Sequence, residues 1–309
     1  MIKRILIAGG AGFLGSHLCE RLVEDGHDVI CLDNFFTSQK SNVAHLLSRP
    51  NFELIRHDVV DPILLEVDEI YNLACPAAPG HYQYNPIKTM KISILGSINL
   101  LGMAKRCSAK IFQASTSEVY GDPEVHPQPE SYRGCVNPIG LRACYDEGKR
   151  FAETLIYENV RHFDLDAIIL RLFNTYGPRM SLDDGRVVSN LINAHLKKDV
   201  FTLYGDGLQT RSFCYIHDAL NAFLKLINSS FKGLHLYNLG NPSEITLLEL
   251  VEIFQKNIAP IEIKFTDFLI DDPKQRKPDI SKIKHALDWE PKIPISRGLM
   301  DMVRFYESR

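Results

Sequence analysis

Tyr145 and Lys149 are a pair of residues in this sequence whose types and spacing suggest chemistry. They lie four residues apart in "CYDEGKRFAE", a stretch of helical periodicity, so their side chains share one helix face. A phenol with a usual pKa of about 10 is a poor base at neutral pH, and a neighbouring ammonium group favours the phenolate. The pair therefore predicts a proton acceptor beside a hydride acceptor.

A second pair with this spacing, Tyr84 and Lys88, lies in "YNPIK". Pro86 suits the first position of a helix, which leaves Tyr84 outside that helix and off the face of Lys88. With 12 tyrosines in the chain, such a spacing also arises by chance. We therefore prefer Tyr145 and Lys149 as the reactive pair.

Four glycines in "GGAGFLG" separate an apolar run from a helix-like pattern. Glycines at a helix start let a pyrophosphate approach the free backbone N–H groups, which here points to Gly9, Gly12 and Gly15. Asp33 ends the next apolar run, where an acid accepts hydrogen bonds from ribose hydroxyls and repels a 2′-phosphate. Glycine clusters also mark ordinary turns, but this order of strand, glycines, helix, strand and acid predicts a site for NAD rather than NADP.

Two further stretches follow apolar runs and carry candidate ligand groups. "ASTSEVYG" holds Thr116, Ser117 and Glu118 where the fifth run ends. Ligands of parallel sheets bind at the carboxyl ends of the strands, so these side chains are expected to face nicotinamide and substrate, although a plain Ser/Thr-rich turn would look similar. Asp58, in "RHDVVD", either meets an adenine amino group or is a solvated loop acid.

Short runs rich in Ile, Val and Leu alternate with segments of helical periodicity, which predicts an α/β fold with a doubly wound parallel Rossmann sheet. The expected strands are 5–8, 29–32, 52–55, 70–74, 111–114 and 167–172, and the expected helices are 16–25, 87–107 and 143–162. After about Tyr176 the segments are punctuated by Gly and Pro. We expect a NAD-binding domain over 1–175 and a smaller C-terminal substrate-binding lobe over 176–309, with some segments, such as 237–240, returning to the sheet.

The composition of the 309 residues, with 45% apolar and 24% charged residues, is that of an ordinary soluble protein. No run reaches the roughly 18 apolar residues of a membrane helix, and a net charge of −3 without a Lys/Arg block argues against a nucleic-acid partner. The start resembles a strand rather than a targeting segment, so a cytoplasmic protein without membrane partner is expected. Seven scattered cysteines and eleven scattered histidines predict reduced thiols and no metal site.

Seven blocks that keep their order add a further signal: "DNFFTSQKSNV", "HDVVDP", "STSEVYGDPEVHPQ", "NPIGLRACYDEGKR", "FNTYGPRM", "DGRVVSN" and "DDPKQRKPDI". Together they closely resemble the UDP-glucuronate decarboxylase (UDP-xylose synthase) family of the extended short-chain dehydrogenase/reductases, from about Lys3 to Tyr306. The resemblance implies a homodimer that retains NAD and converts UDP-glucuronate to UDP-xylose. In that family, oxidation of the sugar 4-hydroxyl creates a ketone that lets CO2 leave, and the ketone is then reduced.

The resemblance also implies roles for individual residues. Tyr145, Lys149 and Thr116 would act on the 4-hydroxyl, and Glu118 and Arg276 would serve the decarboxylation. We expect Arg276 to orient the carboxylate and to assist protonation at C5, and Glu118 with Ser117 to position the sugar ring. Without the resemblance, Arg276 in "KQRK" would be interpreted as a solvated basic residue. Arg186 and Arg211 would each be interpreted as one partner of a surface ion pair. The matches to nucleotide-sugar positions are Glu118, Asn174, Arg186, Tyr204, Gln209, Arg211 and Arg276. The matches to positions around NAD are Gly9, Gly12, Phe13, Leu14, Gly15, Asp33, Asn34, Phe36, Thr37, Ser38, Asp58, Val59, Leu73, Lys91, Ala114, Tyr145 and Lys149.

Three departures and three alternatives accompany this resemblance. Cys75 replaces a usual serine, Leu141 a usual proline and Ser38 a common glycine. A UDP-sugar 4-epimerase would share the Tyr145 and Lys149 pair but has no need of an arginine at a carboxylate. A 4,6-dehydratase would want an Asp-Glu pair in place of Ser117 and Glu118. A non-catalytic NAD or UDP-sugar sensor commonly loses the reactive tyrosine, which is present here.

Overall fold

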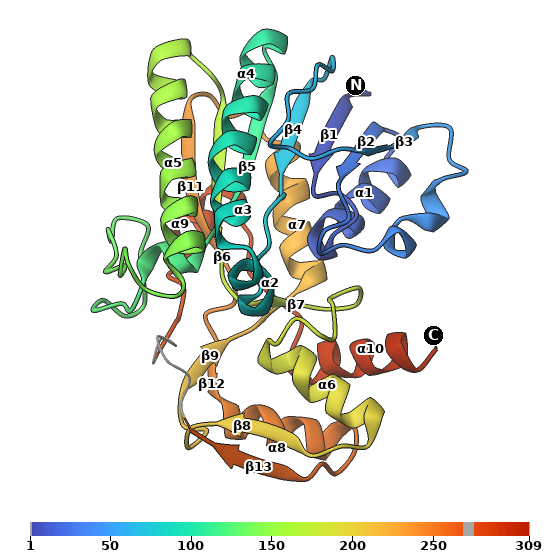
Figure 1. Ribbon diagram of the computed structural model, residues 1–309, viewed down its shortest axis with the longest axis vertical. Coiled ribbons are helices and arrows are strands. Elements are labelled where there is room, and N and C mark those ends of the chain that lie inside the picture. Colours follow the sequence, from blue (N-terminus) through green and yellow to red (C-terminus); the bar gives the residue numbers. More distant parts are fainter. Residues whose placement is uncertain (1, 268–274, 309) are drawn as a thin grey trace.

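Seven parallel strands form the central sheet, which confirms the predicted doubly wound α/β fold (Figure 1). The computed structural model describes residues 2–267 and 275–308. The strand order is β11-β6-β5-β4-β1-β2-β3, so the chain changes direction across the sheet between β1 and β4. These strands are β1 (Arg4–Ala8), β2 (Asp28–Asp33), β3 (Phe52–Arg56), β4 (Glu69–Asn72), β5 (Lys110–Thr116), β6 (Ala167–Leu172) and β11 (Leu234–Leu239).

The two faces of the sheet are both buried, as the continuous apolar strands predicted. Ile5 and Ile7 of β1 pack in one core cluster with apolar residues of α1, α7 and α9. Leu6 and Ala8 point to the other face and pack with residues of α4 and α5. Burial of each large apolar side chain stabilises the fold by about 1.5–3 kcal/mol. The strands are thus fixed in register from both sides.

The helices around the sheet differ from the predicted ones mainly at their ends. α1 begins at Phe13 rather than at residue 16, because Gly12 is extended and caps the helix. The predicted helix 87–107 is divided by a π-helical turn, Ile92–Gly96, against which Gly148 of α5 packs closely. The helices flanking the sheet are α1 (Phe13–Glu24), α2 (Pro79–Tyr84), α3 (Pro86–Lys91), α4 (Ser97–Cys107), α5 (Ala143–Phe163), α7 (Ile216–Ile227) and α9 (Ser281–Leu287).

A smaller lobe lies beyond the carboxyl ends of the strands, at the bottom of Figure 1. It has its own apolar core, which includes Leu191, Phe201 and Leu250. Its elements are α6 (Val187–Lys197), α8 (Leu247–Asn257), α10 (Ile295–Glu307), β8 (Phe201–Tyr204), β9 (Thr210–Ser212), β12 (Glu244–Thr246) and β13 (Ile263–Thr266). β8 pairs with β13 and β9 pairs with β12, while β7 (Thr175–Tyr176) and β10 (Cys214–Tyr215) link lobe and sheet.

Chain segments that follow the lobe's first elements come back to the sheet. β11, which contains most of the 237–240 stretch, pairs in parallel with β6, and α7 and α9 pack on the adjacent face. This return places the loop that carries Arg276 beside the segment after β5, where Gln128 and Lys277 exchange two hydrogen bonds. Within the described ranges, the helices are all too short or too polar to span a lipid bilayer.

Candidate active site

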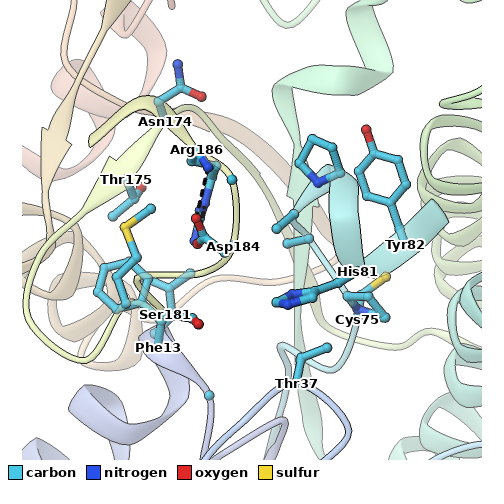
Figure 2. A pocket seen from close by; sticks show the side chains of 18 of the residues that line it. Phe13, Thr37, Cys75, His81, Tyr82, Asn174, Thr175, Ser181, Asp184 and Arg186 are labelled. Carbon is cyan, nitrogen blue, oxygen red and sulfur yellow. Dashed lines mark hydrogen bonds and ion pairs between the residues drawn. The ribbon is translucent and has the colours of Figure 1, made fainter. Parts of the chain in front are cut away.

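A cavity of about 600 Å³ opens at the carboxyl ends of the sheet strands, between the sheet and the smaller lobe. Figure 2 shows Cys75, His81 and Tyr82 on one side of it and Phe13, Ser181, Asp184 and Arg186 on the other. Its lining includes every residue predicted for the cofactor, the chemistry and the nucleotide sugar, except Asp58 and Lys91. The structure therefore gathers residues from the whole length of the sequence at one site.

The glycine loop leaves room for a ligand at the start of α1. Gly9 has a positive φ of 78°, and a Cβ on Gly15 would lie 2.2 Å from the carbonyl oxygen of Gly9. Gly9 and Gly15 therefore cannot carry side chains, because β1 and α1 approach each other too closely at this loop. Among the described residues no side chain caps α1, whose cap residue is Gly12, so its first N–H groups face the cavity with the positive end of the helix dipole.

Asp33 fastens this glycine loop to the end of β2. Its carboxylate accepts hydrogen bonds from the backbone N–H of Ala11 at 2.9 Å and of Phe35 at 2.8 Å. Ser38, which stands where glycine is common in the family, donates its hydroxyl to the same carboxylate at 2.6 Å. The substitution therefore adds a hydrogen bond to the loop, and Asp33 stays at the cavity wall.

Asp58 lies beside the cavity and is paired with Lys88 rather than with Lys91. Lys88 Nζ lies 2.5 Å from Asp58 Oδ2, and Asn34 donates to the same oxygen at 2.9 Å. Burial raises the pKa of Asp58, but the hydrogen bonds, chiefly that from Lys88, lower it below the usual value. Lys91, one turn further along α3, is exposed and outside the cavity lining, so the structure does not bring it to the predicted cofactor site.

Tyr145 and Lys149 lie together in the first half of α5 and both are buried. Lys149 Nζ donates to the carbonyl oxygen of Ala114 at 2.8 Å and lies 5.8 Å from the Tyr145 ring centre. The expectation that the ammonium favours the phenolate is not met in this arrangement: burial raises the pKa of Tyr145 well above its usual value, and only the Thr116 hydroxyl lowers it among the main influences. Additional positive charge is needed before this phenol can act as a base.

Tyr82 fixes the plane of the Tyr145 ring. The two rings stack with centres 5.1 Å apart and planes 9° from parallel. Tyr82 is itself buried, and its hydroxyl has no hydrogen-bond partner among the described residues. No signal in the sequence points to Tyr82, because it comes from α2, a separate segment that only the fold brings to α5.

Thr116 and Ser117 lie where β5 ends and a short 3-10 turn begins. The Thr116 hydroxyl accepts from the backbone N–H of Glu118 at 3.2 Å, which fixes the turn. Both residues are buried and line the cavity. The predicted set of Thr116, Ser117, Glu118, Tyr145 and Lys149 is therefore assembled on β5 and α5.

Glu118 is held between two arginines. Arg276 donates from both terminal nitrogens to the two carboxylate oxygens, with Nη2 2.9 Å from Oε2, and Arg142 donates to Oε2 as well. Burial raises the pKa of Glu118, but Arg276 and then Arg142 outweigh it and bring the pKa to about 2. Arg276 is only 4% exposed, so it is not the solvated loop residue that its local sequence suggests. The first part of its motif, 271–274, lies outside the described residues.

Asp146 is a buried acid next to this ion-pair cluster. It follows Tyr145 in the first turn of α5, where the helix dipole favours the charged carboxylate. Burial opposes this and, together with the negative charge of Glu118, raises the pKa of Asp146 to about 7 despite Arg142 and Arg276. Its Oδ1 has no hydrogen-bond partner among the described residues. Asp146 is therefore protonated for part of the time at neutral pH.

The predicted nucleotide-sugar residues line the lobe side of the cavity. Arg186 is fixed by Asp184, which accepts from its Nε at 2.8 Å (Figure 2). Gln209 donates to the carbonyl oxygen of Tyr204 at 2.6 Å. Arg211 is largely buried, and its Nη1 donates to the carbonyl oxygen of Thr210 at 2.7 Å. Asn174 follows β6, on the same side of the cavity as Arg186 in Figure 2.

Arg142 and Asp146 are not among the site residues predicted from the sequence motifs. Arg142 precedes Tyr145 by three residues and lies directly before α5. The described residues hold no group of three or more His, Cys, Asp or Glu placed to bind a metal ion. The site is built from a phenol, an ammonium, two guanidinium groups and carboxylates.

The fold and the site define an extended short-chain dehydrogenase/reductase. In agreement, the GDP-mannose 4,6 dehydratase family model matches residues 6–302. A solved structure of UDP-glucuronic acid 4-epimerase from Bacillus cereus, in complex with UDP-glucuronic acid and NAD, superposes with a TM-score of 0.88 over 99% of both chains at 27% identity.

Among relatives of known name the similarity is closer. UDP-glucuronic acid decarboxylase 1 of Arabidopsis thaliana is 55% identical over 99% of this chain and 70% of the relative. UDP-glucuronic acid decarboxylase 1 of Danio rerio is 52% identical over 98% of this chain and 72% of the relative. The chain belongs to the UDP-glucuronic acid decarboxylase family, as the seven sequence blocks indicated.

The buried acid at Asp146 gives a prediction for stability. Its pKa of about 7 in the folded protein exceeds the usual 3.8, so between these values the folded chain binds more protons than the unfolded chain and stability falls as pH rises. Asp146→Asn removes this dependence. Between pH 5 and pH 8 the wild type should therefore lose stability that the variant keeps. The difference in unfolding free energy, variant minus wild type, should rise by roughly 1–4 kcal/mol over this range, measured by urea denaturation. Parallel pH profiles would contradict this, and the exposed-site control Asp25→Asn should follow wild type.

Proposed function

We propose that this protein is an NAD-dependent carboxy-lyase that converts UDP-glucuronate to UDP-xylose through a UDP-4-keto sugar. The observation that supports this most is the buried Arg276 and Glu118 pair, which lines the same cavity as Tyr145 and Lys149. An oxidation at C4 and a carboxylate-directed step can then occur on one bound sugar. The names of the relatives and the epimerase complex with UDP-glucuronic acid and NAD support the substrate and cofactor.

The residues at the glycine loop fit NAD. The bare backbone at Gly9 and Gly15 and the uncapped start of α1 suit a pyrophosphate, and Asp33 suits ribose hydroxyls. When bound, NAD would supply positive charge and a ring able to take up a hydride from the sugar C4–H and to give it back in the same turnover. Because the cofactor ends in its starting state, no external oxidant is consumed.

Tyr145 would accept the proton of the sugar 4-hydroxyl, with Thr116 as its hydrogen-bonding partner. The high pKa that burial imposes on Tyr145 makes it a reluctant base. Positive charge that a bound cofactor adds to the cavity, beside the Lys149 ammonium held by Ala114, would lower that pKa toward the working range. The same phenol would return the proton when the ketone is reduced.

Arg276 would orient the substrate carboxylate for CO2 loss. A cation that grips the carboxylate tightly stabilises the ground state and slows its departure. Here the guanidinium is shared with Glu118, whose charge weakens its hold on a second anion. Arg276 contributes by placing the carboxylate rather than by binding it strongly. The ketone at C4 accepts the electron pair left at C5, and a proton from solvent, whose delivery Arg276 would assist, then takes the place of CO2 at C5.

The smaller lobe would hold the UDP moiety, with residues 176–309 as mainly the substrate-binding part. Arg186 and Arg211 present guanidinium groups at the cavity wall, and guanidinium geometry suits phosphate oxygens. Asn174, Tyr204 and Gln209 line the same side. Together they would neutralise the diphosphate and fix the distance from UDP to the reacting sugar.

A UDP-glucuronate 4-epimerase is the second candidate, because the epimerase structure shares the fold and is a complex with the same acid and NAD. Such an enzyme must keep the carboxylate on the sugar. The identity of 52–55% with UDP-glucuronic acid decarboxylases, against 27% with this epimerase, favours decarboxylation over this alternative.

A homodimer and a cytoplasmic location complete the proposal. Helices α3, α4 and α5 and the π-helical turn between α3 and α4 lie on one side of the sheet (Figure 1) and carry several exposed apolar side chains, which supports an interface there. These are Ile87, Met90, Leu95, Ile98, Phe151 and Tyr157.

The location in the cytoplasm is supported by the seven cysteines, all of which are free thiols.

The substrate assignment predicts a simple assay. Purified protein incubated with UDP-glucuronate should release CO2 and form UDP-xylose, followed by mass spectrometry of the nucleotide sugars. NAD should not be consumed in proportion to product, since each turnover regenerates it. Unchanged acid would reject the activity, and conversion to an isomer of equal mass would favour the epimerase.

Arg276 should be needed for CO2 loss and not for NAD binding. In Arg276→Ala the rate of CO2 release should fall by at least about 100-fold, in keeping with the loss of one partner of a buried pair. NAD affinity, measured by fluorescence titration, should change by less than about threefold because Arg276 contacts no residue of the glycine loop among the described hydrogen bonds. Arg276→Gln tests the same point with a smaller change in volume. Equal losses of NAD affinity and CO2 release would contradict the assignment.

The dimer has its own test at the exposed apolar face. Ile98→Glu on α4 places a charge among these side chains and should convert the protein to a monomer, measured by sedimentation velocity. Ile2→Glu is the matched control, since Ile2 is equally apolar, is 72% exposed and lies beside α1 and α7 on the other face of the sheet. An unchanged mass for Ile98→Glu, or a monomeric wild type, would overturn the proposed interface.

A further inference from the structure

Glu118 has two cationic partners, and the roles assigned so far use only one. Arg142 donates to Oε2, the same oxygen that accepts from Arg276 Nη2. The side chains of Arg142 and Glu118 are only 16% and 14% exposed, so the contact is a partly desolvated ion pair rather than a surface one. Arg142 also lines the cavity. A second guanidinium at this carboxylate calls for a function of its own.

Arg276 cannot fully serve Glu118 and a substrate carboxylate at the same time. Both of its terminal nitrogens donate to Glu118, and its buried Nε has no hydrogen-bond partner among the described residues. An incoming carboxylate therefore competes with Glu118 for one guanidinium. A buried carboxylate that loses its cation without replacement is strongly destabilising, so the exchange needs a partner that stays with Glu118.

Resting on the proposed function, we propose that Arg142 is a positioning residue that holds Glu118 in place while Arg276 engages the substrate carboxylate. Its own backbone is well anchored for this. Arg142 directly precedes α5, and its carbonyl oxygen accepts from the backbone N–H of Tyr145 at 2.9 Å. Arg142 thereby links both Glu118 and the Tyr145 phenol to the start of α5.

The charged and titratable groups around Glu118 determine how its pKa changes when Arg142 is removed. Arg276 approaches from its loop, Arg142, Tyr145 and Asp146 from the start of α5, and Tyr82 from α2. Glu147 acts on Asp146 from the next position of α5. Burial raises the pKa of Glu118, and the two arginines lower it. Without Arg142 the pKa of Glu118 rises, and Glu118 depends wholly on Arg276.

The test compares Arg142→Met, Arg142→Gln and Arg142→Lys with wild type. In the Met and Gln variants, affinity for UDP-glucuronate by calorimetry should fall roughly 10- to 100-fold, the scale of a hydrogen bond to a charged group, because Glu118 no longer releases Arg276. Affinity for UDP-xylose, which has no carboxylate, should stay within about twofold of wild type. The acid limb of kcat/KM for CO2 release should move to higher pH, and Lys should restore part of that shift.

Arg161→Met is the matched control, since Arg161 is an exposed arginine near the far end of α5 and pairs with Glu158. It should leave every measure unchanged. Wild-type affinities for UDP-glucuronate in the Met and Gln variants, or equal losses for both ligands, would overturn the role of Arg142. If Arg142→Met does not fold, the Gln variant decides. Absence of CO2 release from wild type would reject the proposed function instead, while the comparison of the two ligands still tests Arg142.

Discussion

The ion pairs of Glu118 organise the active site, because they join three parts of the chain that the sequence separates widely. The carboxylate lies at the end of β5, one guanidinium directly precedes α5, and the other comes from a loop beyond the smaller lobe. None of the three is fully solvated, so each depends on the others for its charge to be tolerated. The geometry of the cavity is therefore fixed by electrostatic necessity as well as by packing.

A second polar network supports the turn that carries Glu118. Glu153 of α5 accepts from Arg171 of β6 at 3.0 and 2.7 Å and from the hydroxyl of Ser115. Arg171 also donates to the Tyr120 hydroxyl at 3.0 Å, and Tyr120 donates to Asn238 of β11 at 2.7 Å. These bonds tie the 3-10 turn after β5 to the neighbouring strand β6 and to β11 beyond it. A buried network with its members satisfied specifies one arrangement, and here that arrangement aims Glu118 into the cavity.

The strands and the glycine loop were predictable because their signals are local. Continuous apolar runs and a helix-start glycine pattern need only neighbouring residues to be recognised, and the Tyr145 and Lys149 pair needs only one helix. The family resemblance pointed to Arg276, but its pairing with Glu118, 158 positions away, depends on the fold alone. The high pKa of Tyr145, the stacking of Tyr82 and the exposure of Lys91 arise from tertiary burial, which spacing does not encode.

The charge balance of the cluster explains how one site can both bind an acid and let its carboxylate leave. Arg142 and Arg276 carry two positive charges against one negative charge on Glu118, and Asp146, with a pKa of about 7, is only about half ionised at neutral pH. A substrate carboxylate would complete the balance without excess attraction. As CO2 departs, negative charge moves from the carboxyl group toward the C4 oxygen, beside Tyr145 and Thr116. Arg276 then pairs with Glu118 again, as it does before the substrate binds. The attraction that draws the acid into the site therefore does not stabilise the bound carboxylate so strongly that CO2 loss is slowed.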